Sequence, residues 1–275
     1  MQQPTFPGAL TSTVSFGNRV NAFLALPENG NGPFGAVILG HERYGLVQHT
    51  LDLTAKFAAS GYVAVAPNLF SRWDGDMEAL NRGDITVPLS DGDIVSYMSE
   101  SLNFLLDHPM VDANRIAVMG VCQSGAYPLL LNRARSEVAV NIVVYGGAQN
   151  REWELNETKS EPYEDILARI SAPVLGMWGE DDFVVSVDNV ARLRGVLEAN
   201  RKSYEFKLFR DMLHGWMNST VPGRYRLRES ELVWQRILDF MERVYAGDFP
   251  KNRVIWRFDS DIDPAYDFTK KVRLA

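Results

Sequence analysis

The feature that most constrains this chain is an apolar run that ends in a sharp turn and is followed by a helix-forming stretch. The run is Arg115–Met119, the turn contains Gly120, Cys122 and Ser124, and Tyr127–Arg135 follows. A turn between a strand and a helix that pass close together needs small residues two positions before and two positions after its centre. Gly120 and Ser124 meet that need around Cys122. The sequence therefore predicts a strand, a tight turn centred on Cys122, and a helix.

Cys122 is the leading candidate for a nucleophile. The predicted turn directs the backbone N–H of Gln123 into a pocket at a helix N-terminus, where the helix dipole favours a thiolate and helps to hold an oxyanion. Two alternatives remain. A lone cysteine is often an inert, buried, small apolar residue, and a second register of the small-residue pattern, from Cys122 to Ala126, places Ser124 at the turn. The length of the strand favours Cys122, because Ile116–Met119 already reaches the turn.

The rest of the chain alternates strand-like and helix-like segments. A hairpin is expected over Thr11–Phe16 and Val20–Leu26, joined by a turn rich in Gly and Asn. Further strands are expected at Gly35–Gly40, Tyr62–Ala66, Arg115–Met119, Val138–Tyr145, Pro173–Trp178 and, last, Tyr204–Phe209. Helices are expected at Leu46–Ser60, Ile94–Leu106, Tyr127–Arg135, Glu161–Arg169, Val187–Ala199 and Glu229–Tyr245. This order predicts an α/β fold with a mostly parallel, doubly wound sheet and an antiparallel N-terminal hairpin, whose functional site lies at the carboxyl ends of the strands.

The predicted domain organisation is a single α/β domain over residues 1–246 and a C-terminal extension over 247–275. The extension contains Trp256, Phe258, Tyr266 and Phe268 among charged residues. Aromatic side chains in such a segment suggest that it packs on something. We expect it to pack either on the body of the protein or on a second subunit, which would make a homodimer.

Composition excludes several classes of function. A net charge of −7 and the lack of basic stretches argue against nucleic-acid binding. No segment approaches the roughly 18 apolar residues of a membrane span, and we expect no membrane partner. A single cysteine rules out an intrachain disulfide and suggests a reducing compartment, so a cytoplasmic protein is expected. The four histidines show no metal-ligand spacing, and neither a metal nor a cofactor is predicted.

A cysteine nucleophile needs a base and a residue that orients the base. His214 follows the strand Tyr204–Phe209, which places it at the same sheet edge as Cys122. It is favoured over the other histidines, which are His41, His49 and His108. The acid is expected among Glu180, Asp181 and Asp182 after the strand Pro173–Trp178, with Asp181 favoured. The chain order nucleophile, acid, histidine is that of α/β-hydrolases.

Further residues are expected around the pocket. Glu42 follows the strand Gly35–Gly40 and is a candidate carboxylate at the pocket mouth, with a solvated loop acid as the alternative. The loop after this strand donates the second oxyanion N–H in α/β-hydrolases, and Arg43 is the candidate. Two long connections, 68–92 and 146–160, are expected to form pocket walls. The candidates for substrate contact are Tyr44, Arg72, Tyr145 and Trp216.

Four motifs in this order resemble the dienelactone hydrolase family. They are Gly40–Gly45, Gly120–Gly125, Gly179–Val184 and His214–Trp216, and the resemblance extends from about Thr11 to Tyr245. It implies a triad of Cys122, Asp181 and His214 that hydrolyses an ester or lactone through an acyl-enzyme. It also implies that Glu42 interacts with the resting thiol, and that the backbone N–H groups of Arg43 and Gln123 form the oxyanion hole.

One position departs from the family. Members that act on dienelactone hold the substrate carboxylate with arginines, one of them four residues after the catalytic histidine, where this chain has Asn218. An amide lacks the charge and the bidentate grip of a guanidinium. The expected function is therefore hydrolysis of a small ester or lactone. A general carboxylesterase, a thioesterase and a non-catalytic binding protein with the same fold are the alternatives.

Overall fold

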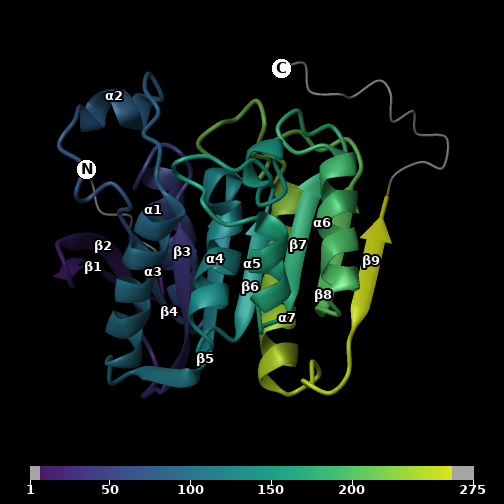
Figure 1. The fold of residues 1–275 in the computed structure, drawn as a ribbon. Helices are drawn as coiled ribbons and strands as arrows, with labels where there is room; N and C mark the ends of the chain where they lie inside the picture. Colours follow the sequence, from purple (N-terminus) through teal and green to yellow (C-terminus); the bar gives the residue numbers. More distant parts are fainter. Residues whose placement is uncertain (1–6, 262–275) are drawn as a thin grey trace.

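The computed structural model describes residues 7–261, whose strands form one nine-stranded sheet in the order β1-β2-β4-β3-β5-β6-β7-β8-β9. The strands are β1 (Ala9–Phe16), β2 (Val20–Pro27), β3 (Phe34–Gly40), β4 (Val63–Pro67), β5 (Val111–Val121), β6 (Val140–Val144), β7 (Val174–Gly179), β8 (Tyr204–Phe209) and β9 (Trp256–Ser260). β2 pairs antiparallel with both β1 and β4, and every other pairing is parallel. The mostly parallel sheet with an antiparallel N-terminal hairpin is thus confirmed (Figure 1).

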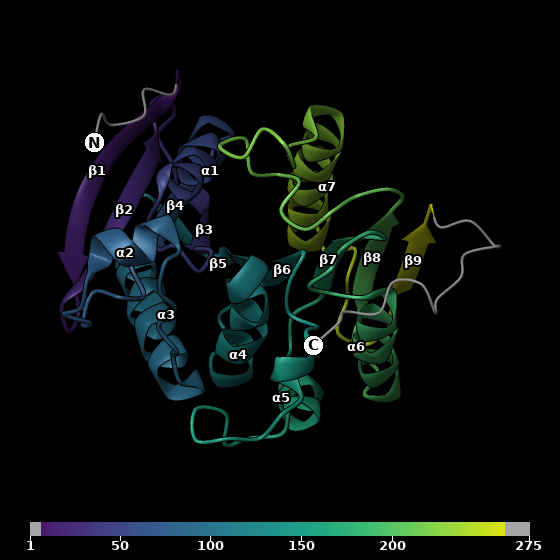
Figure 2. The ribbon, with the colours of Figure 1, turned by 90° about the horizontal axis from the view of Figure 1, so that it is seen from above.

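Helices cover both faces of the sheet. α1 (Gln48–Ala59) and α7 (Leu227–Tyr245) lie on one face. The other face carries α3 (Asp91–Leu106), α4 (Tyr127–Ala134), α5 (Tyr163–Arg169) and α6 (Val187–Ala199). Figure 2 shows these two layers on opposite sides of the strands.

The two layers account for the near-continuous apolar strands. Successive side chains on a strand point to opposite faces, so Val118 of β5 joins the core cluster with Leu102 and Leu129, while Met119 joins the cluster with Phe57 and Trp234. A central parallel strand is therefore apolar at every position rather than at alternate ones. Within residues 7–261, no helix has both the length and the apolarity that crossing a bilayer requires.

The structure differs from the expected elements in two places. A short helix, α2 (Met77–Arg82), lies within the connection expected to be a loop; the Asp76 side chain caps its N-terminus and Gly83, in the left-handed region, ends it. Tyr204–Phe209 is not the last strand, because β9 pairs with it in parallel at the edge of the sheet. The described part of the C-terminal extension thus packs on the body of the protein, and residues 262–275, including Tyr266 and Phe268, lie outside the described residues.

The turn after β5 depends on closely packed glycines. A Cβ atom on Gly120 would lie 2.0 Å from the backbone oxygen of Ser124, and one on Gly125 would lie 2.3 Å from the backbone nitrogen of Gly147. Because the atoms in the way belong to the backbone, they cannot move aside as a flexible side chain could. A side chain at either position would push the strand and the helix apart.

We predict that Gly120→Ala lowers the free energy of unfolding by about 1–3 kcal/mol, the usual cost of overpacking a core. Gly195→Ala is the matched control, since a Cβ atom there meets nothing within 4 Å. In the exposed interior of α6, alanine should raise stability by up to about 1 kcal/mol. Urea unfolding of the two variants measures the difference, and equal stability would contradict the steric argument.

Candidate active site

The turn after β5 presents Cys122 in a strained backbone conformation. Cys122 has φ of 53°, in the left-handed region that side chains other than glycine rarely adopt. Ser124 is fully buried, and its hydroxyl lies 2.9 Å from both the N–H and the C=O of Val121. The serine thus braces the turn, and the residue that the turn projects is Cys122. This geometry does not support the register that puts Ser124 at the turn.

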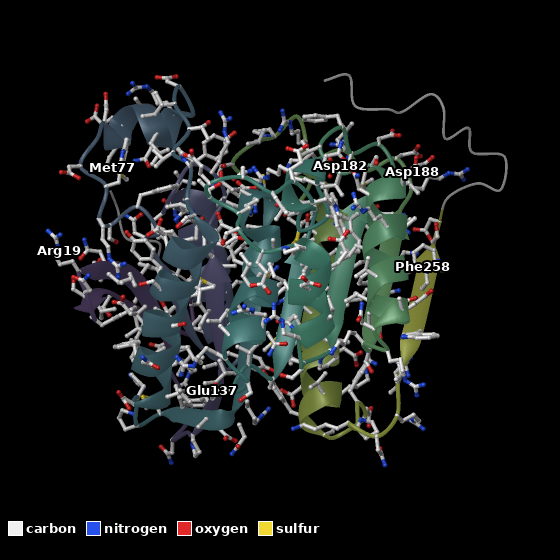
Figure 3. The ribbon with its side chains drawn as sticks, in the orientation of Figure 1. Arg19, Met77, Glu137, Asp182, Asp188 and Phe258 are labelled. Atoms are coloured by element: carbon white, nitrogen blue, oxygen red, sulfur yellow. The ribbon has the colours of Figure 1, made fainter. Side chains whose placement is uncertain are left out.

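Cys122, His214 and Asp182 form a continuous chain of contacts. His214 Nε2 lies 3.0 Å from Cys122 Sγ, and His214 Nδ1 lies 2.9 Å from Asp182 Oδ2 and 3.1 Å from Oδ1. The three residues follow β5, β8 and β7, so the parallel sheet brings residues 92 positions apart into contact at one edge. Figure 3 shows Asp182 at that edge, at the opposite end of the molecule from Glu137.

The carboxylate that orients the histidine is Asp182, so the prediction of Asp181 is wrong. The backbone N–H of Glu180 donates to the carbonyl of Phe209, and that of Asp181 donates to the carbonyl of Met212. These bonds hold the segment after β7 beside the segment after β8. The carboxylate of Asp182 then accepts hydrogen bonds from the N–H groups of Val184 and Val185. These two bonds fix the Asp182 side chain beneath the His214 ring.

The environment of His214 favours its protonated form. Burial alone would lower the pKa of the imidazole, but hydrogen bonds to the Asp182 carboxylate and the Cys122 sulfur, and the charges of both groups, outweigh it and raise the pKa to about 10. An imidazolium next to a sulfur atom stabilises a thiolate. The arrangement therefore suits an ion pair between Cys122 and His214, oriented by Asp182.

Glu42 lies close to this chain but has a different partner from the one expected. It is 4% exposed, and its Oε2 accepts a hydrogen bond of 2.9 Å from Nδ2 of Asn218. Burial raises the pKa of Glu42, opposed by the charge of His214, the Asn218 hydrogen bond and the charge of Arg224. The resting thiol contacts His214 in this structure, and Asn218 holds the carboxylate expected to contact it.

Three of the residues predicted to contact substrate make contacts with other parts of the protein. Arg72 reaches Glu100 of α3 and the carbonyl of Asn18, in the turn of the N-terminal hairpin. Tyr145 and Trp216 are fully buried and pack edge-on, with ring centroids 5.0 Å apart. These aromatic residues belong to the core because they fill the space beneath the catalytic edge, where Tyr145 also packs against the His214 ring at 5.2 Å.

The other predicted residues are Arg43, Tyr44 and Gln123. The Arg43 guanidinium stacks on the Tyr44 ring at 5.0 Å and donates to the carbonyl of Gly83 beside α2. The roles proposed for Tyr44 and for the backbone N–H groups of Arg43 and Gln123 stay predictions. Sequence reasoning passed over Phe183, which is half exposed and packs edge-on against His214 at 5.9 Å. Its place directly after Asp182 was the available signal.

A cavity of about 230 Å³ opens beside the turn after β5, and both long connections, 68–92 and 146–160, contribute to its lining. The first connection contributes Thr86–Leu89, and the second contributes Arg151 and Lys159. Gln123 comes from the turn after β5, and Tyr127 comes from α4. The residue that follows the proposed nucleophile thus lines a space large enough for part of a small substrate.

The other histidines, His41, His49 and His108, lie outside the contacts among Cys122, His214 and Asp182. His41 Nε2 accepts a hydrogen bond from the N–H of Leu69, and burial lowers the pKa of His41 to about 4. Burial likewise lowers the pKa of His49 to about 4, and that of His108 is lowered for the same reason. Among residues 7–261, no three His, Cys, Asp or Glu side chains are grouped so that they could hold a metal ion.

We predict that Asp182→Asn lowers the pKa of His214 from about 10, because the charge and hydrogen bonds that oppose burial are lost. The imidazole would then be neutral over a pH range in which the original protein keeps it protonated. NMR titration of the imidazole nitrogens measures this directly. Asp181→Asn is the control and should leave the titration of His214 in place; the reverse pattern would restore Asp181 as the orienting acid.

Comparison with known proteins identifies the family of the chain. The model of the dienelactone hydrolase family matches residues 20–245. A protein of Escherichia coli (strain K12) named "Putative carboxymethylenebutenolidase" is 28% identical over 86% of this chain and 87% of its own length. A Bradyrhizobium protein named "Probable 2-oxo-3-(5-oxofuran-2-ylidene)propanoate lactonase" is 25% identical over 82% of this chain and 90% of its own length.

The fold is also that of solved structures. The crystal structure titled "Putative Dienelactone Hydrolase" from Klebsiella pneumoniae subsp. pneumoniae MGH 78578 superposes with a TM-score of 0.76, at 23% identity, over 86% of this chain and 100% of that one. The α/β-hydrolase fold is thus confirmed. Since the family model covers most of the chain, including Cys122, Asp182 and His214, this protein belongs to the dienelactone hydrolase family and is a hydrolase of ester or lactone bonds.

Proposed function

We propose that this protein hydrolyses a small ester or lactone through an acyl-enzyme on Cys122, with His214 as the acid and base and Asp182 as its orienting partner. The observation that carries the proposal is the contact of 3.0 Å between Cys122 Sγ and His214 Nε2, with Asp182 on the other ring nitrogen. A nucleophile, a base and an orienting acid in hydrogen-bond reach of one another are what covalent catalysis requires.

In the first half-reaction, the Cys122 thiolate attacks the carbonyl carbon of the substrate. The carbonyl electrons move onto oxygen, and the backbone N–H groups of Gln123 and Arg43 are the proposed donors to this oxyanion. Each such donor is typically worth about 3 kcal/mol in the transition state. The carbon–oxygen bond to the leaving group then breaks, and the His214 imidazolium gives its proton to the leaving oxygen.

In the second half-reaction, water hydrolyses the thioester. Neutral His214 takes a proton from the water as its oxygen attacks the acyl carbon. The carbon–sulfur bond breaks, and Cys122 returns as a thiolate beside the imidazolium. The carboxylic acid leaves the site and gives its remaining proton to water. Asp182 stabilises the imidazolium in both halves and undergoes no net change.

The substrate is proposed to be small, and the cavity of about 230 Å³ that Gln123 lines next to Cys122 is the proposed place for part of it. The relatives named as lactone hydrolases support a lactone. A carboxylesterase or a thioesterase would use the same three side chains, so these stay the alternatives. A thiol nucleophile needs a reduced cysteine, which suits the cytoplasmic location predicted from the sequence.

We expect Cys122→Ala to reduce the hydrolysis of dienelactone and of phenyl acetate by at least about 1,000-fold, as removal of a covalent nucleophile does. The original protein, quenched in acid during turnover of phenyl acetate, should carry an acetyl group on the peptide that contains Cys122. Mass spectrometry detects the adduct. Full turnover by Cys122→Ala would exclude the thiol mechanism, and an original protein that turns over neither ester would favour the binding-protein alternative.

Ser124→Ala is the matched control for this experiment. Its hydroxyl braces Val121 from a buried position, so the variant should lose about 1–3 kcal/mol of stability, the cost of an unsatisfied buried polar group, yet keep the thioester step. Activity measured well below its unfolding temperature should therefore stay within about tenfold of the original. Loss of the acetyl adduct in Ser124→Ala with the fold intact would point to serine chemistry instead.

The homodimer predicted from the extension is proposed to form through β9. No other strand of the described chain pairs with the outer edge of β9, and Trp256 and Phe258 on it are 49% and 42% exposed. Figure 3 shows Phe258 at this edge. An antiparallel pairing of two copies about Phe258 would place Arg257 opposite Asp259 of the second copy, whereas centres at 257 or 259 would oppose like charges. This charge complementarity supports a second copy as the partner.

We predict that the original protein sediments as a dimer at micromolar concentration and that Arg257→Asp sediments as a monomer, because two carboxylates would then face each other. The double variant Arg257→Asp with Asp259→Arg should recover the dimer. Analytical ultracentrifugation measures all three, and a monomeric original protein would remove the proposal.

A further inference from the structure

A second cavity lies at the opposite end of the sheet from Cys122. It has a volume of about 330 Å³ and is lined by the segments that lead into β7 and β8 and by the connection from α7 to β9. Its lining residues are Ile170, Ser171, Ala172, Pro173, Arg201, Lys202, Ser203, Phe249, Pro250, Lys251, Arg253 and Val254. The connection from α7 to β9 runs along the lower edge of the molecule in Figure 1.

The charges around this cavity have a single sign. Four cationic side chains line it, Arg201, Lys202, Lys251 and Arg253, and no carboxylate does. In a protein with a net charge of −7, such a cluster is not what composition alone would give. Four cations around one cavity repel one another, and an anion placed among them would relieve that repulsion.

The two lysines of this cluster differ from the other lysines of residues 7–261 in having no carboxylate partner. Lys56, Lys159 and Lys207 each pair with a carboxylate. Within residues 7–261, Lys202 and Lys251 pair with none, and the same holds for Arg201 and Arg253 among the ion pairs of this part of the chain. Four guanidinium and ammonium groups are thus available to a ligand at one place.

One of the four is held in position. Lys202 Nζ donates a hydrogen bond of 2.9 Å to the carbonyl of Ile170, which keeps the ammonium group at the cavity wall. Burial lowers the pKa of Lys202, since the charged form is partly removed from water. A bound anion would offset that loss of hydration, and an ammonium group keeps further N–H donors for it.

Besides the four cations and two serines, Ser171 and Ser203, the lining of this cavity is apolar. The apolar lining residues include Phe249, Pro250 and Val254 of the connection from α7 to β9, and Ile170 and Pro173 of the segment before β7. The Phe249 ring packs on Phe240 of α7 at 5.0 Å, so it is a fixed surface rather than a loose side chain. A cavity that joins cations to an apolar wall suits a ligand with an anionic group and an apolar body.

We propose that this cavity binds an organic phosphate, with its phosphoryl group among Arg201, Lys202, Lys251 and Arg253 and its body against Phe249 and Pro250. A phosphoryl group carries close to two charges at neutral pH, and arginine and lysine are the side chains that bind it most readily. One carboxylate would leave most of the four cations without a counter-charge, so a multiply charged anion fits better.

This site is separate from the catalytic one. β7 and β8 begin at the cavity and end just before Asp182 and His214, so the length of a strand, about 20 Å for six residues, lies between the two sites. Ligand binding in the cavity and ester hydrolysis at Cys122 can therefore be measured independently.

The test is calorimetric titration of the full chain with phenylphosphonate and with methylphosphonate, at a salt concentration of about 50 mM, which limits screening. These probes share the anionic group, and neither has an ester bond to hydrolyse. We expect phenylphosphonate to bind with a Kd below about 1 mM and methylphosphonate to bind at least about fivefold more weakly, because it has no ring to place on Phe249.

The variants Lys251→Glu and Arg253→Glu should each weaken phenylphosphonate binding by about tenfold or more, since each replaces an attraction by a repulsion. Arg228→Glu is the matched control: Arg228 is exposed on α7, outside the cavity, and its replacement changes the net charge equally. It should leave the Kd unchanged. Hydrolysis of phenyl acetate should stay the same in all three variants.

Three results would overturn the proposal. Absence of binding by either probe up to about 10 mM would remove the site. Equal weakening by Arg228→Glu would reduce the effect to overall charge, and equal affinity for the two probes would remove the apolar part of the ligand. None of these results depends on whether Cys122 is the nucleophile.

Discussion

The active site depends on how closely β5, α4 and β6 approach one another. Gly120 and Gly125 let the backbone segments touch, and a Cβ atom on Gly146 would lie 2.1 Å from the carbonyl oxygen of Cys122. With the chain confined in this way, the residue at the turn takes a left-handed φ, and its side chain leaves the core for the sheet edge. The packing of these backbone segments therefore holds Cys122 in its strained conformation. This conformation places the sulfur within reach of His214.

Electrostatics at this edge is organised around one imidazole. Asp182 is buried, Glu42 is buried, and His214 lies near both, with the Cys122 sulfur on its outer nitrogen. The Asp182 hydrogen bonds offset the cost of burying a charged imidazole. Glu42 has a neutral amide as its hydrogen-bond donor, so burial dominates and raises its pKa. The two buried carboxylates thus differ in their partners: Asp182 has two backbone N–H donors and the His214 ring, whereas Glu42 has the amide of Asn218.

The sequence predicted most of the sheet because the strands are apolar runs between glycine-rich and polar turns, and α6 and β8 have the predicted bounds. It missed β9. Trp256–Ser260 alternates aromatic and charged residues and is exposed at every position, so it has no buried face that a sequence pattern could indicate. It favoured Asp181 over Asp182, although three consecutive acidic residues after β7 give no pattern that shows which of them reaches the histidine. The choice between them is made by the Met212 carbonyl, which binds the Asp181 N–H from a loop far along the chain.

Asn218 determines which kind of group is the partner of the buried Glu42 carboxylate. Its amide donates to Glu42 and its oxygen accepts from the N–H and hydroxyl of Thr220, so both ends of the side chain are used. A charged group at this position would neutralise Glu42, whereas the amide only orients it. The cation near the mouth is instead Arg224, on the same loop, whose guanidinium lies 5.5 Å from the Phe183 ring. Because Phe183 packs against His214, this loop connects the Arg224 charge to the His214 imidazole through one aromatic ring.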